Sequence, residues 1–191
     1  MSELLFNELP RPTFRWLRVN HTVSSLAGED TAVQSIAVEA NKNILSPLPV
    51  GTALLDGNYE GANKEAVHVL VEKAEGYAIN VPPKAKEVVG IRIDANARVA
   101  NRFQFIVGEG AELEVQFYVT GSGDALTNVS YLNEYDVKEA GKVVVKKVNL
   151  LPEHVQHIEH RYTKLEEKAD VEYINIEIGG SENILNYYHD L

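Results

Sequence analysis

The feature that most constrains this chain is a sequence repeat in its second half. Three segments each combine a charged turn, an alanine and a strand-like run, at residues 108–115, 137–144 and 165–172. Their alanines, Ala111, Ala140 and Ala169, are separated by 29 residues twice in succession, and residues 83–89 form a weaker copy. A repeat of this length is typical of stacked supersecondary units. The repeated units look like strands, so the sequence predicts a parallel β-solenoid in which the three alanines lie one above another.

Each coil is expected to contain strands with one buried face. Hydrophobic side chains alternate with polar ones through two runs, and they are Phe103, Phe105, Val107, Leu113, Val115, Phe117 and Val119. Successive side chains of a strand point to opposite faces, so this alternation places the hydrophobic set inside. One coil cannot bury such a face alone, but stacked coils about 4.8 Å apart can.

One later strand breaks the pattern. The alternation first favours Val171 and Tyr173 and then changes phase to Ile174, Ile176 and Ile178. This change predicts a β-bulge or a strand that turns a corner. We also expect Ile176 to belong to the core, so that Ile176→Lys would unfold it.

The first 80 residues lack the solenoid pattern and predict a small α/β segment. Residues 9–18 carry two prolines and the only tryptophan, and they indicate either an arm that packs on its own domain or a partner-docking segment. Residues 31–38 predict a strand, and residues 63–74 predict a helix with an N-cap at Asn63.

The predicted organisation is therefore mainly β, with an N-terminal part at residues 1–80 and a parallel β-helix at residues 81–191. A coil of 29 residues gives between three and four coils. The connection between the first strand and the helix is rich in proline and glycine and predicts loops.

Composition excludes several classes of protein. No run of 18 apolar residues and no charged-then-apolar leader is present, so we expect a cytoplasmic protein without a membrane span. The absence of cysteine excludes disulfides and thiolate ligands for zinc or an iron–sulfur cluster. A net charge of −10 disfavours nucleic acid and anionic membranes as partners.

Several segments, taken in order, resemble the SufB/SufD proteins of the SUF iron–sulfur cluster assembly system. Residues 77–93 resemble the first solenoid strands of that family, and residues 101–113 resemble its recurrent coil motif. Residues 12–20 are similar to its N-terminal proline, tryptophan and arginine segment, and residues 174–180 and 189–191 to a later segment. The order and spacing of these segments carry the resemblance, which is closest to short SufD-like members.

The resemblance implies a right-handed parallel β-helix that acts as a scaffold rather than as an enzyme. Such a subunit pairs with a SufB-like subunit and is served by a SufC-like ABC-type ATPase. The iron–sulfur cluster is then handled by the complex, and this chain is expected to bind no cofactor itself. Family members continue through more coils into a helical segment that binds the ATPase, whereas this sequence stops at Leu191. We therefore expect a fragment or a truncated member without that docking segment.

The histidines of residues 154–160 are the only metal-type residues at short spacing. On a strand His154 and His160 would share one face and His157 would point to the other, so three imidazoles could not converge on one ion. His154 and His157 remain weak metal candidates, and surface or stacking histidines are the favoured interpretation. We expect no tight metal binding.

The C-terminal strands predict an association surface. Residues 171–178 and 184–188 are apolar and contain no lysine or proline to block edge pairing. We expect a two-fold homodimer through these coils, with Ile184, Asn186 and Tyr188 as weak interface candidates.

Two other functions stay open on the sequence. Some parallel β-helices degrade polysaccharides with carboxylates, and this chain has many exposed-type acidic residues, although no pair stands out. A generic interaction platform unrelated to clusters is the other alternative.

Overall fold

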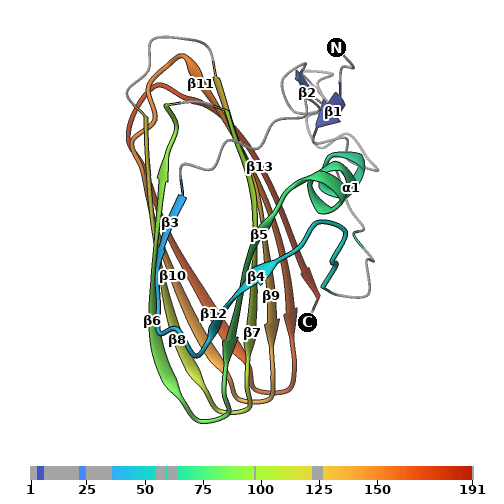
Figure 1. Ribbon diagram of the computed structural model, residues 1–191, viewed down its shortest axis with the longest axis vertical. Helices are drawn as coiled ribbons and strands as arrows, with labels where there is room; N and C mark the ends of the chain where they lie inside the picture. The colour runs from blue at the N-terminus through green and yellow to red at the C-terminus, as the bar shows by residue number, and fades with distance from the viewer. Residues whose placement is uncertain are drawn as a thin grey trace, which may run out of the picture.

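The computed structural model shows a mainly β protein, in which a β-solenoid of about four turns follows a small N-terminal part. The two sheets of the solenoid face each other, and the chain passes from one to the other in every turn (Figure 1). The structure describes residues 4–6, 22–24, 36–54, 59, 64–96, 98–121 and 127–190.

Each turn contributes one strand to each sheet. The first sheet has the order β13 (Glu182–Asp190), β11 (Val155–Leu165), β9 (Thr127–Val137), β7 (Val99–Val107), β5 (Gly76–Val81) and β4 (Leu45–Leu48). The second sheet has the order β12 (Asp170–Glu177), β10 (Lys142–Asn149), β8 (Glu112–Thr120), β6 (Lys86–Asp94) and β3 (Ile36–Glu39). Strands β5 to β13 pair in parallel, as the repeat predicted, whereas β3 and β4 pair antiparallel at the N-terminal end of the stack.

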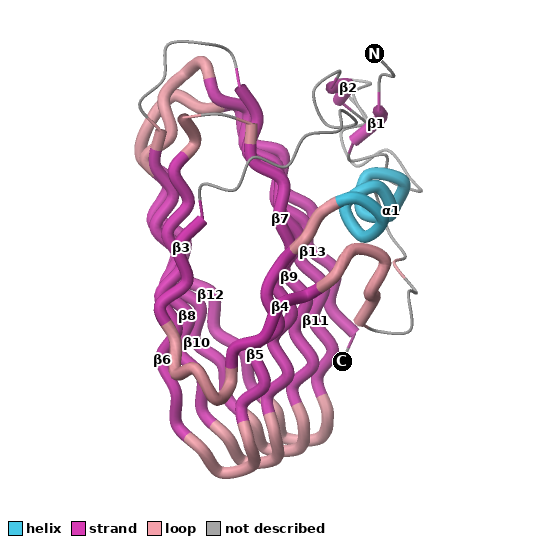
Figure 2. Tube along the Cα trace, viewed as in Figure 1, coloured by secondary structure: helices cyan, strands magenta, loops and turns pink. Residues whose placement is uncertain are grey.

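The turns that lead from the first sheet to the second share one backbone form. The third residue of each has a positive φ, and these residues are Lys84 (64°), Gly110 (62°), Ala140 (55°) and Lys168 (61°). The fourth residue donates its N–H to the carbonyl of the first, at 2.8 to 3.1 Å. Hydrogen bonds also join successive turns, for example from Gly110 N to Glu139 O at 2.9 Å, so the turns stack as the strands do (Figure 2).

The register corrects the predicted alanine column. Glu112 pairs with Lys86 and Lys142, and Lys142 pairs with Asp170, so the preceding residues Ala85, Ala111, Gly141 and Ala169 form the column. Ala140 is the left-handed residue one position earlier, and its predicted place in the column is wrong. The coils are unequal, with 26, 30 and 28 residues between equivalent positions, because the connections at the other end of the coil differ in length.

The hydrophobic core between the sheets matches the predicted alternation. Phe103, Phe105, Val115 and Phe117 are buried, and the Phe103 and Phe117 rings meet edge to face with centroids 5.6 Å apart. Aromatic rings continue between coils, since Phe105 stacks on Tyr135 at 4.7 Å. The core therefore extends continuously along the first three coils.

Strand β12 contains no bulge. It pairs with β10 without interruption from Asp170 to Glu177, so the predicted bulge or corner is wrong. Ile174, Ile176 and Ile178 lie on the outward face and are 40%, 46% and 59% exposed. The expectation that Ile176 belongs to the core is therefore wrong as well, since the inward positions of this strand carry Tyr173, Asn175 and Glu177.

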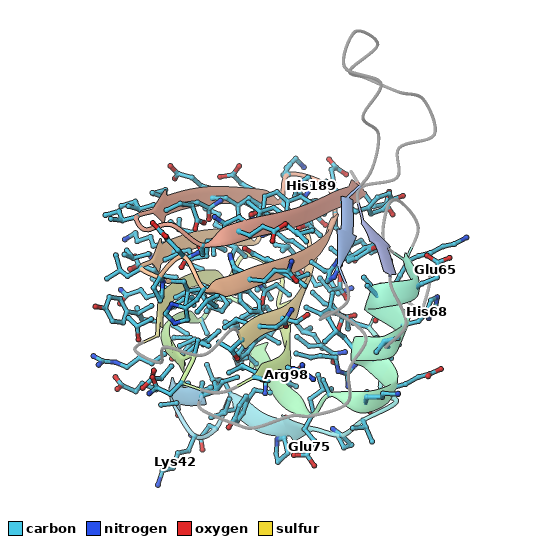
Figure 3. The ribbon with its side chains drawn as sticks, turned by 90° about the horizontal axis from the view of Figure 1, so that it is seen from above. Lys42, Glu65, His68, Glu75, Arg98 and His189 are labelled. Carbon is cyan, nitrogen blue, oxygen red and sulfur yellow. The ribbon has the colours of Figure 1, made fainter. Side chains whose placement is uncertain are left out.

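A single described helix, α1 (Lys64–Lys73), packs on the outer face of the first sheet (Figure 1). It agrees with the predicted helix, although the proposed cap, Asn63, lies outside the described residues. Its hydrophobic face is buried against Leu132 of β9 and Tyr162 of β11, and comprises Val67, Leu70 and Val71. Figure 3 shows the labelled His68 on this helix beside the solenoid, with Lys42 and His189 at opposite ends of the stack.

The rest of the N-terminal part is only partly described. Strand β1 (Leu4–Phe6) pairs antiparallel with β2 (Thr22–Ser24), and β3 overlaps the strand predicted at residues 31–38. The predicted aromatic arm at residues 9–18 lies outside the described residues. Strand β4 was not predicted because Pro47 suggested a loop, but at the antiparallel end of a sheet proline is tolerated. No helix in the described part of the chain is long and apolar enough to cross a membrane.

Candidate functional site

The interior of the solenoid changes from apolar to polar along the stack. Equivalent inward positions on neighbouring strands form columns. The column of Glu159 begins with the buried Asn101, whereas other columns begin with apolar side chains near the N-terminal end. Three of these columns are Ile91, Phe117, Lys147 and Asn175; Ile93, Val119, Asn149 and Glu177; and Val99, Val129, His157 and Asn183. The last coils therefore enclose a polar cluster, which we call the interior cluster: Lys147, His157, Glu159, Arg161 and Glu177.

The carboxylate of Glu159 lies at the centre of the interior cluster. Its Oε2 is 2.7 Å from Lys147 Nζ, and its Oε1 is 2.8 Å from an Arg161 guanidinium nitrogen. Lys147 Nζ also lies 2.7 Å from Glu177 Oε1. These contacts balance two positive with two negative charges, and Lys147, Glu159 and Arg161 are almost fully buried, whereas the Glu177 side chain is 30% exposed.

Aromatic rings enclose the arginine of the cluster. The Arg161 guanidinium lies 3.9 Å from the ring centre of Tyr173 and 4.1 Å from that of Tyr187. The Tyr187 hydroxyl also donates to Glu159 Oε2 at 3.3 Å, and Asn133 Nδ2 donates to Glu159 Oε1 at 3.1 Å. Cation–π contacts and hydrogen bonds therefore hold the ion pair in one geometry.

His157 is the histidine that enters the interior. Its Nε2 lies 2.9 Å from the Tyr131 hydroxyl, and its Nδ1 lies 2.8 Å from Asn183 Oδ1 and 3.1 Å from Asn149 Nδ2. A neutral ring satisfies the two shorter contacts when Nδ1 donates to Asn183 and Nε2 accepts from Tyr131. Burial, aided by the charge of Lys147, lowers the pKa of His157. Both ring nitrogens thus have protein partners, which leaves neither for a metal ion.

The electrostatics keep the carboxylate of Glu159 ionised. Burial alone would raise its pKa, but the charges of Arg161 and Lys147 hold the pKa at about 2. The charge of Glu159 in turn raises the pKa of Arg161 despite burial. An ionised carboxylate cannot donate a proton near neutral pH, so Glu159 acts as the counter-ion of Lys147 and Arg161 rather than as a general acid.

The interior cluster reaches the surface at the C-terminal end of the stack. Tyr187 is 36% exposed, the Glu177 side chain is 30% exposed, and Asn175 and Asn183 are exposed. These side chains point inward from the last strands, β12 and β13. The end face therefore presents polar groups where the apolar interior of the earlier coils would predict a hydrophobic cross-section.

A second set of buried polar residues, Arg102 and Glu134, lies between the first sheet and the N-terminal part. Arg102 of β7 donates to the carbonyls of Ala74 (3.0 Å), Pro49 (2.8 Å) and Thr52. Glu134 of β9 accepts from Leu54 N (3.2 Å), from Gln104 Nε2 (3.0 Å) and from the Tyr59 hydroxyl. Burial raises the pKa of Glu134. These bonds attach Pro49, Thr52, Leu54 and Tyr59 to the outer face of the first sheet.

The two predicted metal candidates do not converge. His154 lies before β11 and is half-buried, whereas His157 is buried inside the solenoid. His160 points to the outer face, where it pairs in register with Leu132, and burial lowers its pKa to about 4. The described residues contain no group of three or more histidine, cysteine, aspartate or glutamate side chains that could hold a metal ion.

Two of the three predicted interface residues, Ile184 and Tyr188, lie on the outward face of β13. Ile184 is only 2% exposed because it packs against Ala66 of α1 and Ile158 of β11. Tyr188 is half-buried, with its ring 5.5 Å from that of Tyr162, and Asn186 pairs in register with His160. Ile184 is thus covered within the chain. The exposed large apolar side chains at this end include Ile174 and Ile176 of β12, Ile178 immediately after β12, and Tyr187 of β13.

Apart from His157, the members of the interior cluster were not predicted as site residues from the sequence. A signal was present, since Lys147 and Asn149 have the same parity as the inward Val143 and Val145. However, a lysine at an inward position is normally taken to mean that the strand has been assigned the wrong register, and not that the lysine is buried.

No protein-family model, curated protein or solved structure matches the chain. The geometry and the sequence resemblance are therefore the grounds for a function.

Proposed function

We propose that this chain is a non-catalytic scaffold subunit of a SUF-type iron–sulfur cluster assembly machinery in the cytoplasm. It pairs with a SufB-like subunit, and a SufC-like ATPase serves the complex. The observation that carries the proposal is the placement of the two most extended resembling segments. Residues 77–93 supply β5 and β6 and residues 101–113 continue through β7 into β8, so they occupy successive coils of one solenoid.

The open end of the solenoid supports the proposed scaffold role. Strands β12 and β13 are the last strands of their sheets, so each has one edge whose backbone groups no described strand pairs with. Edge strands with few blocking charges pair readily with another chain. In this proposal a SufB-like subunit adds strands to this end, and a second copy of the chain occupies it when that subunit is absent.

The cluster is the cargo of the complex rather than a cofactor of this chain. The sequence has no cysteine to ligate iron, and the ring nitrogens of His157 have protein partners. The polar end face, with Asn183 and Glu177, would then contact the partner and orient it. Iron and sulfide ligands would come from the SufB-like subunit.

The carbohydrate-active alternative receives less support from the carboxylates. A glycosidase acid needs a raised pKa. Glu112 and Glu114, on the outward face of the second sheet, form hydrogen-bonded ion pairs with Lys86 and Lys146, both at 2.8 Å, and these lower their pKa values. Glu134 has a raised pKa, but it is buried.

Co-expression with partners tests the proposal. A tagged copy of this chain would be produced with the SufB-like and SufC-like proteins of the same genome and purified through the tag. We expect the SufB-like protein in equimolar amount, with the SufC-like ATPase recovered only when the SufB-like protein is present. Recovery of the folded chain alone would contradict the proposal.

A pair of matched variants locates the contact. Ile176→Lys adds a charge to the exposed face of β12, whereas Val88→Lys adds one to β6 on the same sheet, three strands away, where Val88 is 58% exposed. The first should reduce recovery of the SufB-like protein and the second should not.

A further inference from the structure

The first sheet contains buried polar atoms without a hydrogen-bond partner among the described protein groups. Three of them belong to neighbouring inward side chains: Asn133 Oδ1, the Tyr135 hydroxyl and Arg161 Nε. All three residues are at least 99% buried. Nearly all buried polar groups are bonded to protein or to ordered water, because an unpaired one destabilises the fold. Three such atoms on adjacent residues therefore indicate a bound molecule.

The backbone places these three side chains together. Asn133 and Tyr135 are two positions apart on β9 and so share the inward face, and Asn133 pairs directly with Arg161 of β11. Tyr173 of the facing sheet contacts both groups, because its ring lies 5.9 Å from that of Tyr135 and its ring centre lies 3.9 Å from the Arg161 guanidinium.

The bonds that are made show where the unpaired atoms point. Asn133 Nδ2 and an Arg161 terminal nitrogen both donate to Glu159 Oε1, at 3.1 Å and 2.8 Å. Asn133 Oδ1, at the other corner of its amide group, is therefore turned away from that oxygen, and Arg161 Nε is a further donor of the guanidinium that no described protein group accepts. Tyr135 lies on the far side of Asn133 from the Glu159 column, since Glu159 pairs with Tyr131.

We propose that Asn133, Tyr135 and Arg161 bind one buried water molecule. The water accepts a hydrogen bond from Arg161 Nε, donates one to Asn133 Oδ1, and makes a third with the Tyr135 hydroxyl. Buried waters typically make about three such bonds. These three partners suit a neutral molecule, because one is a donor, one is an acceptor and the hydroxyl can be either. An ion is not required, since the charges of Lys147 and Arg161 are already balanced by those of Glu159 and Glu177.

The site is closed on its apolar side by the preceding coil. Phe105 stacks on Tyr135, with ring centres 4.7 Å apart, so the water lies at the boundary between the apolar and the polar coils. Its role is to complete the hydrogen bonding of Arg161 between Tyr173 and Tyr187. This inference concerns the interior of the chain alone and does not depend on any partner.

The isosteric substitution Tyr135→Phe tests the site by the sign of its effect in urea unfolding. If water bridges the hydroxyl, the substitution removes one of its bonds and should raise the unfolding equilibrium constant roughly 2- to 10-fold, lowering the urea midpoint. If no water is bound, the hydroxyl is an unsatisfied buried group, and its removal should raise the midpoint.

Tyr131→Phe is the matched control. The Tyr131 hydroxyl bonds to His157 Nε2 at 2.9 Å, so its loss should lower the midpoint in either case and shows that the assay detects one interior hydroxyl. A high-resolution crystal structure of the wild type should show a water about 3 Å from Asn133 Oδ1 and Arg161 Nε. An unchanged or raised midpoint for Tyr135→Phe beside a lowered one for Tyr131→Phe overturns the proposal, as does a crystal structure with no water between these atoms.

Discussion

Lys147 and Glu159 come from different sheets and meet inside the solenoid, with 2.7 Å between Nζ and Oε2 and with both side chains at most 1% exposed. Arg161 and Glu177 complete a set of four charges that is closed to water except at Glu177. Charges in such surroundings stabilise a fold only while every member keeps its partner.

Removing the central carboxylate should therefore be severe. Glu159→Gln leaves Arg161 buried without its counter-ion and removes one partner of Lys147, so we expect the free energy of unfolding to fall by about 3 to 5 kcal/mol. The control is Glu166→Gln, which breaks the exposed 3.1 Å pair with Lys138 and should cost less than about 1 kcal/mol. Urea unfolding of both variants gives the comparison, and equal losses would show that the interior pair is no more important than a surface pair.

Acidification should destabilise the protein in two steps. Burial holds the pKa of His160 at about 4 and lowers that of His157, so below the ordinary histidine value of about 6.5 the unfolded chain binds protons that the folded chain does not. Stability contributed by these neutral rings is lost as the pH falls from about 7 to 4. Glu159, with a pKa of about 2, contributes stability above the unfolded value of about 4.3 that is lost as the pH falls towards 2.

The urea midpoint measured at intervals from pH 7 to pH 3 tests this expectation. It should fall throughout, and His160→Gln should flatten the segment between pH 7 and pH 4. A midpoint that is constant or rises on acidification over that interval would refute the assignment of buried neutral histidines.

The stacked turns offer a stabilising substitution. Ala140 has a φ of 55°, a left-handed conformation that costs an L-residue with a Cβ about 1 kcal/mol relative to glycine, and Gly110 occupies the same position in the coil before it. Ala140→Gly should therefore raise the free energy of unfolding by roughly 0.5 to 1 kcal/mol. Glu139→Gly, one residue earlier where φ is not positive, should lower it, and thermal unfolding of the pair would distinguish the two directions. A loss of stability in Ala140→Gly would mean that the turn is not left-handed at this position.

The sequence contained most of the fold because the early coils obey simple alternation. Phe103, Phe105, Leu113 and Val115 lie inside as the period-two pattern requires, and the charged turns repeat once per coil. The register was less predictable. A repeat that looks constant at 29 residues conceals coils of different length, and only the backbone pairing shows that Gly141 rather than Ala140 follows Ala111.

The candidate site could not be predicted for a related physical reason. Pattern reasoning assigns charged side chains to the outside, so it did not identify Lys147 and Arg161 as interior residues, and it placed Ile176 in the core. The last coils do not follow this rule. Ion pairs take the place of apolar contacts in their interior, and Ile174 and Ile176 lie on the exposed face. The ion-paired residues come from different strands and meet only when the coils stack, so no local stretch of sequence predicts that they are partners.

The exposed isoleucines now give a direct test of association. Because Ile176 is 46% exposed, Ile176→Lys should leave the chain folded, contrary to the expectation from sequence, and it should weaken any contact made by the open end. Val88→Lys on β6, three strands away in the second sheet, is the control, and circular dichroism of both variants should match the wild type.

The central claim is that the open end formed by β12 and β13 is an association surface, and the mass of the chain in solution tests it most directly. Light scattering across a range of concentrations should give twice the monomer mass of 21.2 kDa for the wild type and for Val88→Lys, and a lower mass for Ile176→Lys. A mass of 21.2 kDa for the wild type at every concentration would contradict the claim.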